Sequence, residues 1–273
     1  MSVPFTKMHG LGNDFMIVYT EAAPPAAGRI RAWADRRLGI GFDQLLWVGP
    51  ARDSAAEAAY RIFNSDGSEA EQCGNGARCI VKFLADRGHD TAELMLEHGG
   101  GLAAARLLPD GQVAVAMGEP DFRPAALPFK ASAQAEVYEV EVGDSSVELR
   151  VVSMGNPHAV LRVDDVDTAP VERLGPALES HERFPSRANI GFVQIVDPSH
   201  VRLRVFERGV GETQACGTGA CAAAVTSQRA GWLDPTVRVE LPGGWVTVDW
   251  KGPGEPVWLT GEAITVFEGT VAE

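Results

Sequence analysis

Two segments of the chain carry one pattern: Cys73-Gly74-Asn75-Gly76-Ala77 and Cys216-Gly217-Thr218-Gly219-Ala220. They are separated by 143 residues, counted from 73 to 216. The same separation aligns many other residues without a gap. Among them are Gly12-Asn13 with Gly155-Asn156, Arg61 with Arg204, Phe63 with Phe206, Glu69 with Glu212, Gly88 with Gly231, and Gly100-Gly101 with Gly243-Gly244. A single offset that holds along most of the chain indicates an internal duplication, and it predicts two similar domains.

The stretch 119–144 is the expected connection between the two domains. It contains Pro120, Pro124 and Pro128, which is typical of a crossover rather than of a helix or a central strand. If the two domains face each other, their equivalent residues can meet at a cleft. Cys73 and Cys216 are equivalent in this sense.

Both halves show a mixture of strand and helix patterns. Residues 61–64, 93–97, 201–206, 237–241 and 246–250 are rich in residues that favour strands. Residues 77–86 and 220–229 are rich in alanine and other apolar residues, and Gly88 and Gly231 follow as helix ends. We therefore expect each domain to be a set of strands with an apolar helix packed inside.

Composition and charge exclude several classes of partner. The chain has 273 residues, of which 45% are hydrophobic and 22% charged, as in ordinary globular proteins. The formal net charge is −13 and the pI about 4.9, so nucleic acid and anionic membranes are not expected partners. No apolar run has the length of a membrane span, and the first residues do not have the pattern of a signal peptide. We expect a soluble cytoplasmic protein.

The two cysteines each precede glycines at the start of a predicted helix. Glycines let the backbone turn so that several N–H groups point one way, and a helix N-terminus adds positive potential. Such a site can bind a carboxylate beside the thiol. The same field favours the thiolate, by up to about 2 kcal/mol in good geometry.

Two thiols at one cleft should titrate as a coupled pair, with one thiolate and one thiol, because two thiolates repel each other. Inversion at a carbon needs this state: a base on one face removes the α-proton and an acid on the other face delivers one. Because the α-proton can be removed from either face of the carbon, the acid and the base should be chemically alike. Backbone N–H donors aimed at the α-carboxylate would stabilise the developing carbanion, each by about 3 to 4 kcal/mol if they act as in acyl-transfer sites.

Other readings of the cysteines are open. Cys73 and Cys216 can be buried packing residues at helix starts, since buried cysteine is common. A zinc site is a second alternative, although the spacings between Cys73 and Cys79 and between Cys216 and Cys221 fit ligand pairs poorly. Cys79 and Cys221 do not align at the common offset, and we interpret them as packing residues.

The motifs around the cysteines resemble those of a known family, the diaminopimelate epimerases, which interconvert LL- and meso-diaminopimelate. The resemblance extends over most of the chain in the family's order. The matching segments are Lys7-Met8-His9-Gly10-Leu11-Gly12-Asn13-Asp14-Phe15, Phe63-Asn64-Ser65-Asp66-Gly67-Ser68-Glu69, Met154-Gly155-Asn156-Pro157-His158, Glu207-Arg208-Gly209-Val210-Gly211-Glu212-Thr213 and both cysteine motifs.

The resemblance implies an α/β (α+β) fold of two pseudo-symmetric domains, each a mixed sheet wrapped around a central helix. We expect one domain at residues 1–118, with 263–273 returning to it, and the other at 119–262. The family acts in lysine and cell-wall precursor biosynthesis, needs no cofactor such as pyridoxal phosphate and no metal, and its membership is compatible with a homodimer.

The resemblance also implies the roles of individual residues. Cys73 and Cys216 would be the catalytic pair, with His158 and Glu207 supporting catalysis. The expected substrate-binding residues are Asn13, Gln44, Asn64, Gly74, Asn75, Asn156, Asn189, Glu207, Arg208, Gly217 and Thr218.

The chemistry of diaminopimelate agrees with part of this set. The substrate has a second amino-acid head that does not react. Arg208 can clamp its carboxylate and Glu207 its ammonium group, whereas the alternative for these two is a surface ion pair of little energetic value. His158 can equally be a structural histidine, and Asn13 and Asn156 can share a role in turns. A two-cysteine racemase for proline or hydroxyproline and a non-catalytic amino-acid-binding protein are the competing functions.

Overall fold

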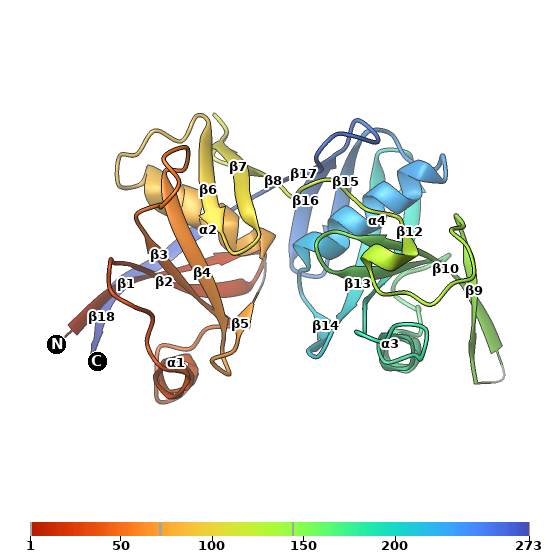
Figure 1. Cartoon of the computed structure of the whole chain (residues 1–273), viewed down its shortest axis with the longest axis horizontal. Coiled ribbons are helices and arrows are strands. Elements are labelled where there is room, and N and C mark those ends of the chain that lie inside the picture. Colours follow the sequence, from red (N-terminus) through yellow and green to blue (C-terminus); the bar gives the residue numbers. More distant parts are fainter. Residues whose placement is uncertain (1, 71–72, 144, 273) are drawn as a thin grey trace. The chain divides into compact units, whose positions relative to one another are not determined.

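The computed structural model describes residues 2–70, 73–143 and 145–272. The chain divides into two compact units, Met1–Ala116 with Thr260–Glu273, and Met117–Leu259. Figure 1 labels the helices and strands of both units. Strand β17, Trp258–Gly261, spans the boundary between the units. In the described part of the chain, no helix is long and apolar enough to cross a membrane.

The first unit is a mixed sheet. Its strands pair in the order β18-β1-β2-β3-β4-β6-β7-β8, with β5 on β4, and two of these pairs, β2–β3 and β4–β6, are parallel. The strands are β1 Ser2–Gly10, β2 Asn13–Tyr19, β3 Gln44–Gly49, β4 Ala58–Asn64, β5 Glu69–Ala70, β6 Leu94–His98, β7 Gly101–Leu107, β8 Val113–Ala116 and β18 Ile264–Ala272.

Helix α2, Gly74–Ala85, is the central helix of this unit. It contacts β1, β2, β3, β7, β8 and β18, so the sheet curves around it. Ten of its residues are buried, because strands surround it on most sides. Helix α1, Ala27–Ala34, packs with Ile30 and Trp33 against a second apolar cluster on these strands. Strands covered on both faces carry continuous apolar runs, as β2 does.

The second unit repeats this plan. Its strands pair in the order β9-β10-β11-β12-β13-β15-β16, with β14 on β13, and the pairs β11–β12 and β13–β15 are parallel. The elements are η1 Pro124–Ala126, β9 Tyr138–Val142, β10 Ser145–Ser153, β11 Pro157–Arg162, α3 Val171–Glu179, β12 Asn189–Asp197, β13 His200–Glu207, β14 Gly211–Thr213, α4 Gly217–Arg229, β15 Thr236–Leu241 and β16 Gly244–Asp249.

Helix α4 is the central helix of the second unit and contacts β10, β11, β12, β13, β15 and β16. Its residues from Gly217 to Ser227 are all buried. A run of alanines suits this place, since alanine favours helix and its small side chain lets strands approach closely. Helix α3 packs Leu174 and Leu178 into a cluster with β9 to β12. The predicted fold class is therefore confirmed, with one helix wrapped by a mixed sheet in each unit.

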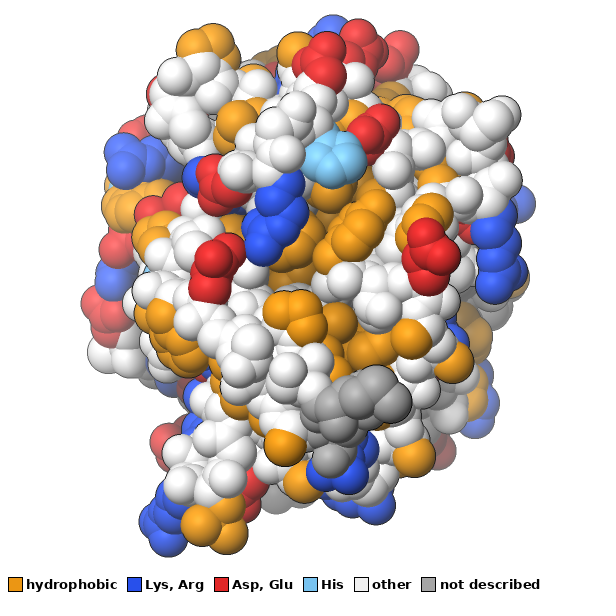
Figure 2. All heavy atoms as spheres, turned by 90° about the vertical axis from the view of Figure 1, so that its left-hand side faces the viewer, with side chains coloured by type: hydrophobic (Ala, Val, Ile, Leu, Met, Phe, Trp, Pro, Cys, Tyr) orange, Lys and Arg blue, Asp and Glu red, His pale blue; other side chains and the backbone are white. Residues whose placement is uncertain are grey.

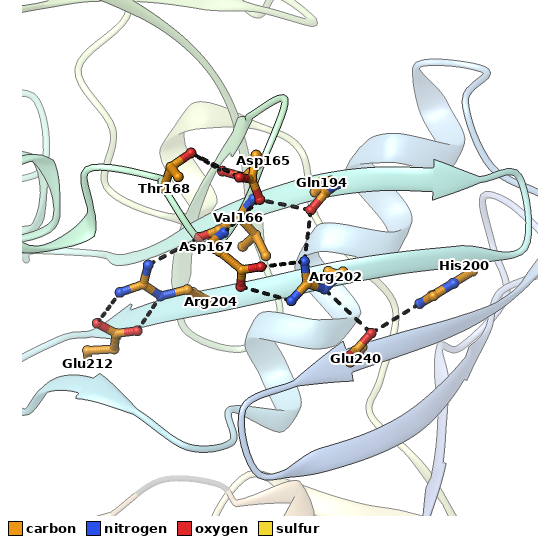
Figure 3. A network of polar contacts seen from close by, with 10 residues as sticks. All are labelled: Asp165, Val166, Asp167, Thr168, Gln194, His200, Arg202, Arg204, Glu212 and Glu240. Carbon is orange, nitrogen blue, oxygen red and sulfur yellow. Dashed lines mark hydrogen bonds and ion pairs between the residues drawn. The ribbon is translucent and has the colours of Figure 1, made fainter.

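One ion pair recurs in both units and explains part of the repeat. In the first unit Arg61 Nε and Nη2 donate to the two carboxylate oxygens of Glu69, at 2.7 Å each. In the second, Arg204 makes the same two bonds to Glu212, at 2.6 and 2.9 Å (Figure 3). Each pair ties the short strand β5 or β14 to its neighbour, and the chain leaves this short strand toward the cysteine.

The helix starts differ from the sequence-based prediction. We expected helices at 77–86 and 220–229, but α2 begins at Gly74 and α4 at Gly217. The glycines after each cysteine are therefore in the first helical turn rather than in a preceding turn. The predicted ends are correct: Gly88 and Gly231 follow the helices with φ of 86° and 73°, a conformation that glycine adopts without strain.

Candidate active site

Cys73 is the N-cap residue of α2. Its backbone is extended, and its Sγ accepts a hydrogen bond from Gly76 N at 3.4 Å. The helix dipole places positive potential at this point. Asn13, from the start of β2, accepts a hydrogen bond from the Cys73 thiol at an Sγ–Oδ1 distance of 3.6 Å. The thiol is half-buried.

The side chain of Asn75 joins the same group. Its Nδ2 donates to Asn13 Oδ1 at 3.3 Å, and its Oδ1 accepts from Arg78 Nη2 at 2.8 Å. Gly74 and Asn75 are the first residues of α2, as the expected carboxylate site requires. Arg78 is fully buried and holds Asn75 from the next turn of the helix. This role was not predicted from the sequence, although Arg78 directly follows the cysteine motif.

Gln44 and Asn64 lie on neighbouring strands, opposite each other in the β3–β4 register. Gln44 Nε2 donates to Asn64 Oδ1 at 3.0 Å, and Asn64 Nδ2 donates to Ser68 Oγ at 3.1 Å. Both residues are at strand ends, Gln44 at the start of β3 and Asn64 at the end of β4. The five side chains predicted in this half thus form two hydrogen-bonded groups.

Cys216 precedes the first residue of α4, as Cys73 does for α2, but it is buried, with 5% of its surface exposed. Its Sγ is 3.7 Å from the Thr218 hydroxyl. Burial raises the pKa of the Cys216 thiol well above its ordinary value, and the negative charge of Glu207 raises it further, while hydrogen bonds from Thr218 and Gly219 N oppose the rise.

His158 and Asn156 complete the surroundings of Thr218. Asn156 Nδ2 is 3.4 Å from Thr218 Oγ1, and Asn156 Oδ1 is 2.9 Å from His158 Nε2. His158 is buried, and burial together with the charge of Arg208 lowers its pKa to about 3. The imidazole is therefore neutral at ordinary pH.

Asn189, Glu207 and Arg208 lie at one end of β12 and β13. Asn189 Oδ1 accepts from Arg208 N at 2.9 Å, and its Nδ2 donates to Pro157 O at 3.1 Å, so backbone groups engage both ends of this amide. Glu207 accepts a hydrogen bond from Thr213 Oγ1. Arg208 Nη1 reaches Ser186 O at 3.5 Å. These residues form one group in the second unit.

The two groups occupy matching places in their units. Asn13 and Asn156 each follow a glycine of positive φ, and Asn64 and Glu207 end equivalent strands. Gln44 and Asn189 begin the strands that pair in parallel with β2 and β11. Cys79 and Cys221 are fully buried in the central helices. No cluster of three or more potential metal ligands is found within residues 2–70, 73–143 and 145–272.

A network of charged side chains that is bonded to Asn13 was also not predicted from the sequence. It contains Lys7, Asp14, Arg36 and Asp43, and Asn13 Nδ2 donates to Asp43 Oδ2 at 3.0 Å. Lys7 and Asp14 belong to the same matching segment as Asn13, which is the signal that could have found them.

Known proteins similar to this chain are mainly epimerases. The family model described as diaminopimelate epimerase matches residues 5–123 and 150–266. A diaminopimelate epimerase of Alkalilimnicola ehrlichii is 56% identical over 276 residues, covering 99% of both chains. One of Pseudomonas aeruginosa is 55% identical over 274 residues, again covering 99% of both chains.

Solved structures of lower identity share the fold. A hydroxyproline epimerase from Agrobacterium vitis matches with a TM-score of 0.72 and 18% identity, covering 99% of this chain and 92% of that one. A Bacillus anthracis phenazine biosynthesis protein of the PhzF family matches with a TM-score of 0.71 and 21% identity over the whole of both chains. The near-complete match to the family model and the relatives above 50% identity settle the classification: this chain belongs to the diaminopimelate epimerase family.

Proposed function

We propose that this chain is an epimerase that interconverts LL- and meso-diaminopimelate without a cofactor, in lysine and cell-wall precursor biosynthesis. The observation that carries the proposal is the identity of over 50% with diaminopimelate epimerases along the full chain. The surroundings of Cys73 and Cys216 support it, because each thiol is at the N-terminus of a central helix and has polar neighbours.

The proposed reaction uses the cysteines as a pair. One thiolate takes the α-proton, so that an S–H bond forms as the C–H bond breaks, and the electron pair is delocalised toward the α-carboxylate. The other thiol then delivers its proton to the opposite face of the α-carbon. The charge on sulfur has moved from one cysteine to the other, and the reverse reaction restores it.

The first turns of α2 and α4 supply the donors for this carbanion. Backbone N–H groups of a first helical turn have no partner within the helix, and here they belong to Gly74 and Asn75, and to Gly217 and Thr218. We propose that they bind the α-carboxylate, which carries most of the developing charge. The neutral His158 holds Asn156 without adding a charge to the site.

The distal head of the substrate needs a cation and an anion. Arg208 and Glu207 supply both, and Asn13, Gln44, Asn64, Asn156 and Asn189 offer amide donors and acceptors. Side chains of this polarity suit a second amino-acid head better than the apolar ring of proline.

Three further points belong to the proposal. We propose that the two units are the epimerase domains expected at 1–118 with 263–273 and at 119–262. Because the chemistry needs reduced thiols, we place the protein in the cytoplasm. We also propose a homodimer, formed through the apolar side chains exposed on β18.

The test is incubation of the reduced protein with LL-diaminopimelate in D2O, followed by chiral chromatography and mass spectrometry. We expect meso product that carries one α-deuteron. Exchange on proline or hydroxyproline without exchange on diaminopimelate would instead assign the competing racemase function. Binding of diaminopimelate without any exchange would assign a binding protein.

A further inference from the structure

The amide of Asn13 is held in one orientation by Asp43. Asp43 Oδ2 accepts from Asn13 Nδ2 at 3.0 Å and from Asp14 N at 3.1 Å. A carboxylate has only acceptors, so it selects the NH2 end of an amide and leaves the oxygen end turned away. That oxygen is Oδ1 of Asn13, which faces Cys73 Sγ at 3.6 Å and Asn75 Nδ2 at 3.3 Å.

Asp43 is itself anchored. Arg36 Nη2 donates to Asp43 Oδ1 at 2.6 Å, and Arg36 also makes two hydrogen bonds to Asp14, at 2.8 and 2.9 Å. Lys7 donates to Asp14 at 2.6 Å. Burial opposes the charge on Asp14, but the hydrogen bonds from Arg36 and Lys7 outweigh it and hold the pKa of this carboxyl well below its ordinary value. The Asp14 carboxylate therefore stays charged, and Arg36 links it to Asp43.

The equivalent asparagine of the second unit is oriented the other way. Asn156 Oδ1 faces His158 Nε2 at 2.9 Å, and Asn156 Nδ2 faces Thr218 Oγ1 at 3.4 Å. The neutral imidazole selects this orientation in the tautomer that carries its proton on Nε2, because Nε2 then donates to Asn156 Oδ1. Asn13 thus turns an acceptor toward its cysteine, while Asn156 turns a donor toward the hydroxyl beside the other one.

We propose that Asp43 is a positioning residue, which acts through the Asn13 amide to hold an oxygen acceptor at Cys73 and so favours the protonated thiol. The proposal rests on the two-thiol function proposed above and deepens it. A hydrogen bond donated by S–H stabilises the thiol, whereas an N–H donor at the same place would stabilise the thiolate. The orientation of this amide therefore shifts Cys73 toward the thiol, against the helix N-terminus and the Gly76 N–H, which favour the thiolate.

Two other titratable groups of the described residues interact with Cys73, and neither loses its proton together with it. Tyr60 and Cys79 are both buried, and burial raises the pKa of each well above its ordinary value. Both remain neutral over the range in which a thiol ionises. Of the groups named around Cys73, the charged ones are Arg78, which binds Asn75, and the network of Asp43, Asp14, Arg36 and Lys7.

The test is the pH dependence of alkylation of Cys73 by iodoacetamide, read from its peptide by mass spectrometry. Asp43→Asn leaves one oxygen for three donors, Arg36 Nη2, Asn13 Nδ2 and Asp14 N. Because Arg36 is charged and takes that oxygen, the new NH2 faces Asn13, whose amide turns over and presents NH2 to Cys73. We expect the midpoint to move to lower pH by about half a unit or more, with epimerase activity reduced about tenfold.

A double-mutant cycle separates orientation from charge. Asn13→Ala removes the acceptor, so the midpoint should move to lower pH, and adding Asp43→Asn to it should change nothing more. A shift by Asp43→Asn that persists in the Asn13→Ala background would overturn the proposal, since it would come from the lost charge alone. An unchanged midpoint in either single variant would overturn it as well.

Two controls complete the design. Asp110→Asn removes an exposed carboxylate that accepts hydrogen bonds from Gln112, and the Cys73 midpoint should stay in place. Thermal unfolding checks that each variant folds. If Asp43→Asn does not fold, the midpoint of Asn13→Ala still tests whether the Asn13 oxygen favours the thiol of Cys73. Alkylation needs no substrate, so a wild-type protein inactive on diaminopimelate would contradict the proposed function and leave this test intact.

Discussion

Cys73 and Cys216 are equivalent in sequence but have different surroundings. Cys73 is half-buried and has the oxygen of Asn13 at 3.6 Å. Cys216 is buried and lies in the field of Glu207, and its pKa is raised for both reasons. The proposed two-thiol mechanism therefore starts from two thiols that differ in burial and in neighbouring charge. The immediate surroundings of each cysteine therefore determine how readily its thiol loses a proton before the substrate binds.

Replacing either cysteine by serine should remove nearly all epimerisation. A serine hydroxyl is a far weaker acid than a thiol, so it cannot serve as the base at neutral pH. We expect Cys73→Ser and Cys216→Ser each to lower turnover of diaminopimelate by about a thousandfold or more, measured by chiral chromatography. Cys79→Ser lies outside the proposed pair and is the matched control. A single variant with full activity would contradict the two-base mechanism.

Replacing Glu207 by glutamine should make the Cys216 thiolate form at lower pH. The charge of Glu207 raises the pKa of Cys216, so its removal lowers that pKa and moves the titration toward neutral pH. The ultraviolet absorbance of thiolate, followed against pH in a Cys73→Ser background, measures the shift. Glu212→Gln removes a carboxylate paired with Arg204 and should leave the titration unchanged. Equal titrations of the two variants would show that Glu207 has no such influence.

At the scale of elements, the starts of α2 and α4 determine the site. The ion pairs Arg61–Glu69 and Arg204–Glu212 (the latter in Figure 3) hold the short strands before each cysteine. Each helix then begins directly after the cysteine. The glycines of the first turn allow close packing there. A Cβ added to Gly219 would lie 3.0 Å from Val205 Cγ2 and 3.2 Å from Cys216 Sγ.

Gly219→Ala should therefore displace the Cys216 thiol and lower activity. The added methyl group must move either the sulfur or Val205, and a displacement of a few tenths of an ångström is costly in a close-packed site. We expect a loss of activity of about tenfold or more, measured as turnover of diaminopimelate. Gly28→Ala, in the exposed part of α1, would bring its Cβ only within ordinary contact of the Arg31 guanidinium, at 3.8 Å, so it should keep activity and raise stability by about 0.5 kcal/mol. Full activity of Gly219→Ala would contradict this packing argument.

At the scale of the whole molecule, β18 exposes apolar side chains. Ile264, Val266 and Phe267 are 40%, 54% and 47% exposed, next to the charged side chains of Arg87 and Glu268. The face of the first unit in Figure 2 shows hydrophobic side chains gathered among charged ones. Large apolar side chains exposed near charged ones are typical of a protein interface.

We expect the protein to be a homodimer that Phe267→Glu weakens. A carboxylate placed in an apolar interface loses hydration without gaining a partner, so dimers should dissociate at concentrations at which the wild type remains paired. Size-exclusion chromatography with light scattering measures the mass. Leu38→Glu, at a side chain 92% exposed on the loop after α1, is the control and should not change it. A monomeric wild type would contradict the proposed assembly.

Much of the fold could be predicted from particular residues. The offset of 143 residues indicated two similar units, and the structure shows why it persists: the same ion pair, the same glycine ends and the same central helix recur. Helix starts were predicted three residues late, because glycine has a low helix propensity while burial in the wrapped sheet stabilises it in α2 and α4.

Residue identity and spacing along the chain were enough to predict the family, the repeat and the candidate site residues, because none of these depends on how the strands and helices pack. Tertiary structure alone decided which end of the Asn13 amide faces Cys73, that Asp43 selects it, and that Cys216 is buried beside Glu207. An amide orientation and the pKa of a thiol depend on groups that are distant in sequence and meet only when strands and helices pack together. No local pattern of residues encodes them.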